Sequence, residues 1–156
     1  MKTIAFVWVG KLKEPFWRDA AAHYWKSAGR FFRLEETIIK DAPGKLPPDK
    51  RTALEGERIL AALPASALAI GLDVTGKQYA SEPFAALLDK LTEDANRTPT
   101  LIIGGPYGLS APVVARCAMR VSLGAMTLPH ELARVVLLEQ VYRAGAILHG
   151  LPYHHG

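Results

Sequence analysis

An apolar run leads directly into a glycine-rich turn at Thr100-Leu101-Ile102-Ile103-Gly104-Gly105-Pro106-Tyr107-Gly108-Leu109-Ser110. The run predicts a buried strand, and Ser110 is of a type that favours the start of a helix. The pair Gly104-Gly105 lets the backbone turn tightly and approach a ligand closely. The segment matches neither G-x-G-x-x-G nor a phosphate-binding loop that ends in Lys and Ser or Thr. A tight turn and a binding loop are equally good interpretations at this point.

Strand-like and helix-like runs alternate on either side of this segment. We expect strands at 2–9, 34–39, 68–72, 100–103 and 120–122, and helices at 14–32, 49–63, 81–95, 110–119 and 131–148. This alternation predicts an α/β fold with a doubly wound, mostly parallel sheet. Ligands bind such sheets at the carboxyl ends of their strands. The loops after Leu72, Ile103 and Ser122 follow strands, so we expect them to meet at one edge.

Composition indicates one globular domain. The chain has 156 residues, 49% of them hydrophobic and 22% charged, with a net charge of +4, which is ordinary for a water-soluble domain. No apolar run is long enough for a bilayer, so we expect no membrane partner. The single Cys117 has no disulfide partner within the chain, which favours a reducing, cytoplasmic location. The modest positive balance permits RNA binding without requiring it.

A second loop, Leu123-Gly124-Ala125-Met126-Thr127-Leu128, carries no charge. It offers backbone groups and small apolar side chains, which suit an adenine ring, although such loops are more often buried connectors. His130 follows Pro129 and either caps the next helix or belongs to a site. Asp73 either binds a ribose hydroxyl or stabilises a turn with Gly76.

The last helix and the tail carry the remaining polar candidates. Arg143 lies on a largely apolar helix and needs a partner, either Glu139 one turn earlier or an anionic ligand. The tail contains Tyr153-His154-His155. No spacing in the chain fits a zinc pattern, so we expect no metal.

Four ordered motifs together resemble one family. They are Gly104-Gly105-Pro106-x-Gly108-Leu109-Ser110, Leu128-Pro129-His130, Glu139-Gln140-x-Tyr142-Arg143-Ala144 and Pro152-Tyr153-His154. At these spacings the chain resembles, over its whole length, the RlmH (YbeA-type) family. These are bacterial methyltransferases of the SPOUT class that act on large-subunit ribosomal RNA.

The resemblance implies a single SPOUT-type domain over residues 1–156, whose C-terminal segment passes through a deep trefoil knot. It also implies a homodimer that binds S-adenosyl-L-methionine without a metal. Carried onto this chain, the cofactor contacts would be Leu72, Gly104, Leu123, Gly124, Ala125, Met126, Thr127 and Leu128. The implied reaction is methylation of N3 of a pseudouridine in the large-subunit hairpin that bridges to the small subunit, in the assembled ribosome.

We expect the enzyme mainly to position its substrates and to stabilise the anion formed when the pseudouridine loses its N3 proton. His154 is the candidate base, with Tyr153 orienting the uracil ring and Arg143 stabilising the anion; His130 is a competing base. One alternative is a non-catalytic ribosome-binding or assembly factor with the same fold. A nucleotide hydrolase would need a lysine near Gly108 or a carboxylate pair for magnesium, and neither is present.

Overall fold

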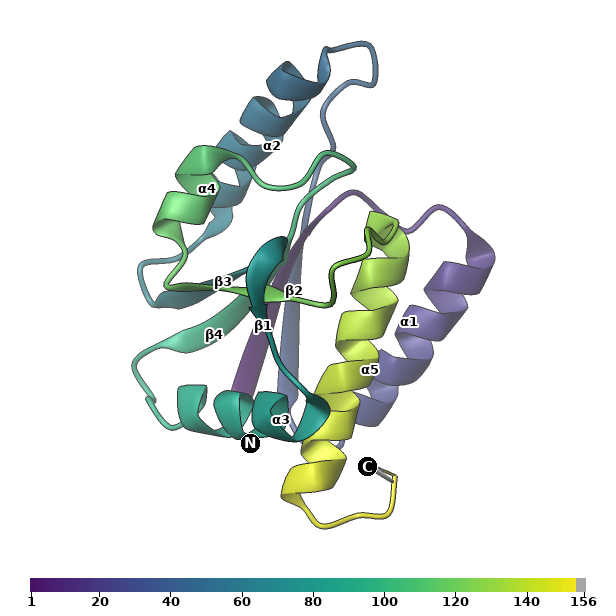
Figure 1. Cartoon of the computed structure of the whole chain (residues 1–156), viewed down its shortest axis with the longest axis vertical. Coiled ribbons are helices and arrows are strands. Elements are labelled where there is room, and N and C mark those ends of the chain that lie inside the picture. The colour runs from purple at the N-terminus through teal and green to yellow at the C-terminus, as the bar shows by residue number, and fades with distance from the viewer. Residues whose placement is uncertain (154–156) are drawn as a thin grey trace.

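The computed structural model describes residues 1–153 as strictly alternating strands and helices (Figure 1). The strands are β1 (Thr3–Val9), β2 (Arg33–Ile39), β3 (Ala67–Gln78), β4 (Thr98–Ile103) and β5 (Met119–Ser122). The helices are α1 (Pro15–Ala28), α2 (Pro48–Ala62), α3 (Ser81–Leu91), α4 (Ala111–Arg116) and α5 (His130–Leu148).

The five strands form one sheet in the order β2-β1-β4-β3-β5, and every pairing is parallel. The predicted α/β class and parallel sheet are therefore confirmed. From β1 the chain passes to β2 at one edge of the sheet and then crosses to β3. Strand β4 next fills the central position between β1 and β3, and β5 forms the opposite edge. Because all strands run the same way, the loops that follow β3, β4 and β5 leave from related positions along one edge.

Two hydrophobic clusters lie on opposite faces of the sheet. Ile4, Phe6 and Trp8 of β1 face the layer of α1, α3 and α5, whereas Val7 and Val9 face α2 and α4. All five side chains are buried, because a central parallel strand is covered on both faces. Complete burial of such a side chain stabilises a fold by about 1.5–3 kcal/mol. Figure 1 shows α5 beside α1, with α3 to the left of the lower part of α5.

Strand β3 is longer than its sequence predicts. The expected turn from Asp73 to Lys77 lies inside the strand, where the pairing with β5 shifts register between Leu72 and Lys77. A Cβ at Gly76 would lie only 2.7–2.8 Å from backbone atoms of Arg120 and Val121. The glycine therefore allows β5 to approach this part of the chain, which is an effect of tertiary contact rather than of local propensity.

The helices expected from residues 49 and 81 begin at Pro48 and Ser81. Asp49 lies in the first turn of α2 rather than at its cap, which is Pro47. Ser81 is the first residue of α3, and its hydroxyl donates to Oε1 of Gln140 on α5 at 2.8 Å. Ser110 occupies the cap position of α4 without a side-chain cap hydrogen bond. Its side chain fills the space where Gly56 of α2 lacks a Cβ.

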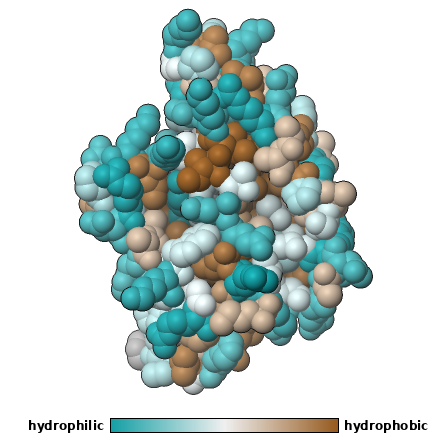
Figure 2. Space-filling view, turned by 180° about the vertical axis from the view of Figure 1, so that it is seen from behind, coloured by the Kyte–Doolittle hydropathy of each residue, from teal (hydrophilic) through white to brown (hydrophobic). Residues whose placement is uncertain are grey.

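The face of the molecule opposite to the view of Figure 1 is a mixture of hydrophilic and hydrophobic surface, with a compact hydrophobic patch near the upper end (Figure 2). Among residues 1–153, no helix is both long enough and apolar enough to cross a membrane.

Candidate functional site

The segments that follow Leu72, Ile103 and Ser122 meet at one sheet edge as expected, although the first is an irregular part of β3 rather than a loop. They surround a pocket of about 430 Å³ at the carboxyl ends of the first part of β3, of β4 and of β5. Seven of the eight predicted cofactor-contact residues line it, and Ala125 does not. The seven are Leu72, Gly104, Leu123, Gly124, Met126, Thr127 and Leu128. The sheet topology thus places together segments that lie more than 50 residues apart in the sequence.

One wall is the glycine-rich turn after β4. The amide of Gly108 donates to the carbonyl of Gly105 at 3.0 Å, and Gly108 has a φ of 81°, which favours glycine. A Cβ at Gly104 would lie 2.6 Å from the carbonyl oxygen of Gly108. The turn therefore folds onto the strand end that carries it, and its residues from Gly104 to Leu109 line the pocket. Tyr107 projects from its tip and is 54% exposed.

A second wall is the loop after β5. The buried hydroxyl of Ser122 accepts from the amide of Gly124 at 3.1 Å and donates to its carbonyl at 2.9 Å. Gly124 has a φ of 142°, so a residue with a side chain would be strained there. Met126 is 83% exposed. This loop has a fixed base at Ser122 and a flexible apolar side chain at its mouth.

Asp73 lines the pocket but already has partners. It accepts from the amide and hydroxyl of Thr75 at 3.2 and 3.1 Å and from Arg120 at 3.5 Å. Burial raises the pKa of the carboxyl, but the hydrogen bonds from Thr75 and the guanidinium of Arg120 outweigh it and lower the pKa overall. Both proposed roles for Asp73 thus have support: it stabilises a local bend and also faces the pocket.

His130 lies at the pocket as the first residue of α5, while the cap position belongs to Pro129. Burial lowers the pKa of His130 and, with nearby Arg134 and Lys13, outweighs the opposite effect of Glu131 and Glu55, so the neutral imidazole is favoured. No lysine or arginine within residues 1–153 lines the pocket. The pocket of one chain therefore contains a neutral histidine and one paired carboxylate but no cation.

Arg143 and Tyr153 form a separate cluster at the other end of α5. Oε1 of Glu139 accepts from Nε and an amino group of Arg143 at 3.0 and 2.6 Å and from the hydroxyl of Tyr153 at 3.0 Å. The guanidinium lies 4.7 Å from the centre of the Tyr153 ring. Thirteen residues of helix separate His130 from Arg143, which corresponds to about 20 Å. One chain therefore does not bring these candidates together, and His154 lies outside the described residues.

Two buried charged residues near the site were not singled out from the sequence for these roles. Arg134 is 3% exposed, donates to the carbonyls of Gly10 at 2.8 Å and Val9 at 3.3 Å, and lies over the ring of Trp8. It fixes the carboxyl end of β1. The sequence signal that could have identified Arg134 is its charge within the otherwise apolar pattern of α5.

Glu55 is also 3% exposed. Its Oε2 accepts from the amide of Ala42 at 2.9 Å, and its Oε1 lies 2.5 Å from where a Cβ of Gly105 would be. The carboxylate therefore supports the glycine-rich turn from behind. The sequence offered no signal for it, because α2 is otherwise an ordinary amphipathic helix.

Within the part of the chain that the structure describes, no group of three or more His, Cys, Asp or Glu side chains is arranged to hold a metal ion. The predicted cofactor loops also carry no such cluster.

Similarity to known proteins agrees with this geometry. A family model described as "Predicted SPOUT methyltransferase" matches residues 1–154. The chain is 56% identical over 155 residues to a ribosomal RNA large subunit methyltransferase H of Maridesulfovibrio salexigens, covering 99% of both chains. This chain belongs to the RlmH family of SPOUT methyltransferases. Family members of the same name from Nitratidesulfovibrio vulgaris and Oleidesulfovibrio alaskensis are 53% and 52% identical, over 99% of this chain and the whole of each relative.

Solved structures show the same fold at low sequence identity. A probable methyltransferase of Bordetella pertussis aligns over 92% of this chain and 94% of its own, with a TM-score of 0.54 and 16% identity. A probable methylase family protein of Haemophilus influenzae aligns over 98% of this chain and 70% of its own, with a TM-score of 0.57 and 12% identity. Both share the α/β architecture of this chain.

Proposed function

We propose that this chain is a methyltransferase that uses S-adenosyl-L-methionine to methylate large-subunit ribosomal RNA. The observation that carries the proposal is the pocket of about 430 Å³, which segments following three parallel strands line mainly with glycines and apolar residues. The family and the names of relatives at more than 50% identity support the substrate class. A pocket of this kind suits an adenosyl group, which needs an apolar slot and hydrogen bonds to its ring edge.

The specific reaction proposed is methylation of N3 of a pseudouridine in the hairpin that bridges the ribosomal subunits, with the assembled ribosome in the cytoplasm as substrate. A new N–C bond forms as the methyl–sulfur bond breaks, and the N3 proton leaves to a base. When bound, S-adenosyl-L-methionine would supply a methyl group that is already activated. The chain then has to orient the base in line with that methyl, where proximity alone supplies large rate effects.

Residues of this chain divide these tasks. Leu72, Gly104 and the loop from Leu123 to Leu128 would hold the cofactor through backbone groups. His130 is favoured as a neutral imidazole, which is the form that accepts a proton. His154 remains the competing base, on the tail next to Tyr153.

We further propose that the active unit is a homodimer. No lysine or arginine of the described residues lines the pocket, and the Arg143 cluster lies about 20 Å along α5 from it. Leu132 and Val136 of α5 are apolar yet only partly buried in one chain. A second copy packed on α5 would cover them and could bring its Arg143 and Tyr153 toward the pocket. The trefoil knot implied by the family resemblance stays a prediction.

The first test is transfer of labelled methyl from S-adenosyl-L-methionine to purified bacterial ribosomes that lack the modification, beside separated large subunits and naked rRNA. We expect label on intact ribosomes, mapped to the bridging hairpin. No label on any substrate, with the cofactor shown to bind, would mean that the RNA target is wrong. Neither label nor cofactor binding would favour the non-catalytic assembly factor.

A further inference from the structure

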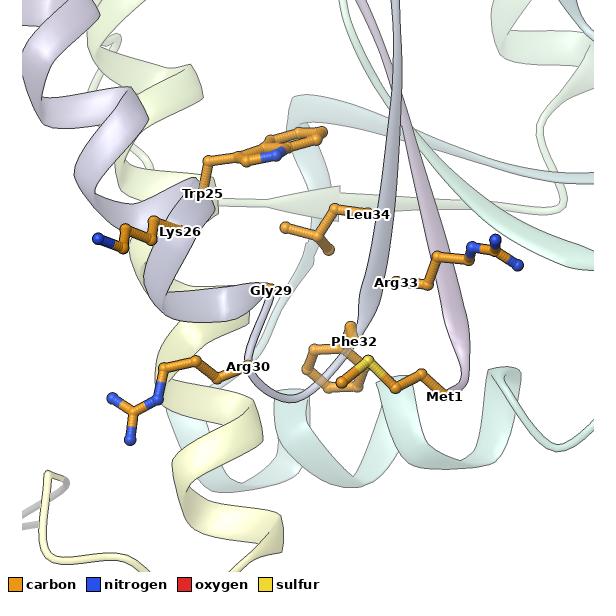
Figure 3. Close-up of a pocket in the computed structure, with 8 residues that line it drawn as sticks. All are labelled: Met1, Trp25, Lys26, Gly29, Arg30, Phe32, Arg33 and Leu34. Atoms are coloured by element: carbon orange, nitrogen blue, oxygen red, sulfur yellow. The ribbon is translucent and has the colours of Figure 1, made fainter.

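A hollow of about 450 Å³ lies between the C-terminal part of α1 and the start of edge strand β2. Trp25, Phe32 and Leu34 are apolar residues that line it. Figure 3 shows the indole of Trp25 reaching across the hollow toward Leu34, with Phe32 beneath. Phe32 is buried, whereas Trp25 and Leu34 are only partly buried. The hollow thus has an aromatic wall that a planar group could contact.

Three cations lie at the rim of this hollow, and their side chains point away from it. Figure 3 shows the side chains of Lys26 and Arg30 extending outward from the helix side and that of Arg33 from the strand side. Residues 22–34 contain these three cations and no acid. Within residues 1–153, none of the three forms an ion pair. Their charge is therefore available to an external anion.

A second hollow of about 510 Å³ shares Trp25 and continues along α1 to Lys11, in the loop after β1. Glu36 is the one acid that lines it among the described residues, and it accepts a hydrogen bond from Nε1 of Trp8 at 3.0 Å. Arg134 lines this second hollow, and its neighbour Ala133 lines the proposed cofactor pocket. A strand of ligand lying in the two hollows would therefore run from the vicinity of the reaction to Trp25.

We propose that this groove between α1 and β2 binds an unpaired segment of the RNA substrate, with phosphates on Lys26, Arg30 and Arg33 and a base against Trp25. The inference rests on the proposed function for the identity of the RNA. Its physical basis is the combination of unpaired cations and an aromatic wall, the pattern by which proteins hold single strands through charge and base stacking. An acidic protein segment would use the cations but would not need the partly exposed indole of Trp25.

The test uses the full chain and a fluorescein-labelled single-stranded oligouridine, with binding followed by anisotropy over a salt series. The variant Lys26→Gln/Arg30→Gln/Arg33→Gln should bind at least about tenfold more weakly. Its slope of log affinity against log salt should fall by about 2, because each phosphate contact on a single strand contributes about 0.7. The control Lys40→Gln/Lys90→Gln/Arg97→Gln removes the same charge elsewhere and should keep most of the affinity and slope.

Two more measurements separate the possible failures. Trp25→Leu should weaken binding of the oligonucleotide with little change in the salt slope, because stacking releases no counterions; its fold is checked by thermal melting, and Trp25→Phe should retain most of the binding. Methylation of ribosomes by the triple variant should show a raised KM for ribosomes with unchanged affinity for S-adenosyl-L-methionine. Equal losses in the triple variant and its control, or none in either, would overturn the groove proposal. Absence of methylation by the wild type would instead overturn the proposed function, and oligonucleotide binding would still report on the groove.

Discussion

Substitution of Gly104 by alanine tests whether the glycine-rich turn shapes the cofactor pocket. The new Cβ would lie 2.6 Å from the carbonyl oxygen and 2.8 Å from the carbonyl carbon of Gly108, and 3.0 Å from Cδ2 of Leu109. Two of these three atoms belong to the backbone of a hydrogen-bonded turn, so side-chain rotation cannot relieve the contact. Restoring an ordinary separation of 3.4 Å requires the turn to move by about 0.8 Å.

Overpacking of this kind costs about 1–3 kcal/mol of folding stability. A displacement approaching 1 Å in a wall that positions the reacting groups can also cost on the order of 100-fold in rate. For Gly104→Ala we therefore expect weaker binding of S-adenosyl-L-methionine in titration calorimetry, by about tenfold for each 1.4 kcal/mol of the cost that falls on the bound state. Urea unfolding measures the part that falls on the fold.

Gly44→Ala is the matched control. A Cβ there meets nothing within 4 Å, and its φ is not positive. Its stability should change by no more than about 0.5 kcal/mol, with cofactor affinity unchanged. If Gly104→Ala bound the cofactor with wild-type affinity and transferred methyl at the wild-type rate, the turn would not be a wall of the functional site.

Three further predictions concern residues of α5 and their contacts. Burial lowers the pKa of His130, so the unfolded chain binds a proton more readily and stability falls as the pH drops below about 6.5. Urea midpoints at about pH 7.5 and about pH 5.5 should accordingly differ more for the wild type than for His130→Gln, and equal differences would contradict this. Burial, together with the hydrogen bond to Glu139, raises the pKa of Tyr153 to about 12. Glu139→Gln should therefore bring tyrosinate absorbance to lower pH in an alkaline titration, with Tyr153→Phe identifying the signal; an unchanged curve would show that Glu139 does not hold the tail. Arg134→Met leaves the carbonyl of Gly10 without its donor, so it should lower the free energy of unfolding, measured by urea denaturation, by about 1–3 kcal/mol. Wild-type stability would show that Arg134 does not hold the carboxyl end of β1 in place.

The alternation of apolar runs and turn residues was sufficient to predict the α/β class, the parallel sheet and the meeting of three loops at one edge. These features follow from local patterns and from the geometry of parallel strands. The length of β3 was not predictable in this way. Asp73 and Gly76 favour a turn in isolation, but contact with β5 keeps the chain in the strand.

The loops of the candidate site were predictable from the sequence, but the buried residues that hold those loops in place were not. Gly104 and the uncharged segment at Leu123–Leu128 are visible in the sequence because glycines and missing charges are local signals. Glu55 and Arg134 support the site through contacts with Gly105 and Gly10, more than 45 residues distant in each case. The position of Arg143 about 20 Å from His130 follows from helix length. Whether the two residues share one site depends on the proposed homodimer, which the sequence of one chain does not show.

The glycines packed against named side chains limit how this chain can vary. Gly56 leaves room for Ser110, Gly105 for the carboxylate of Glu55, and Gly145 for the ring of Phe31. In each pair, the glycine can be replaced by a larger residue only if the side chain that packs against it becomes smaller. Single replacements such as Gly56→Ala should therefore be damaging, while Gly56→Ala combined with Ser110→Gly should recover part of the loss. We expect these positions to change in pairs during divergence, so the walls behind the pocket would keep their shape while their sequence drifts.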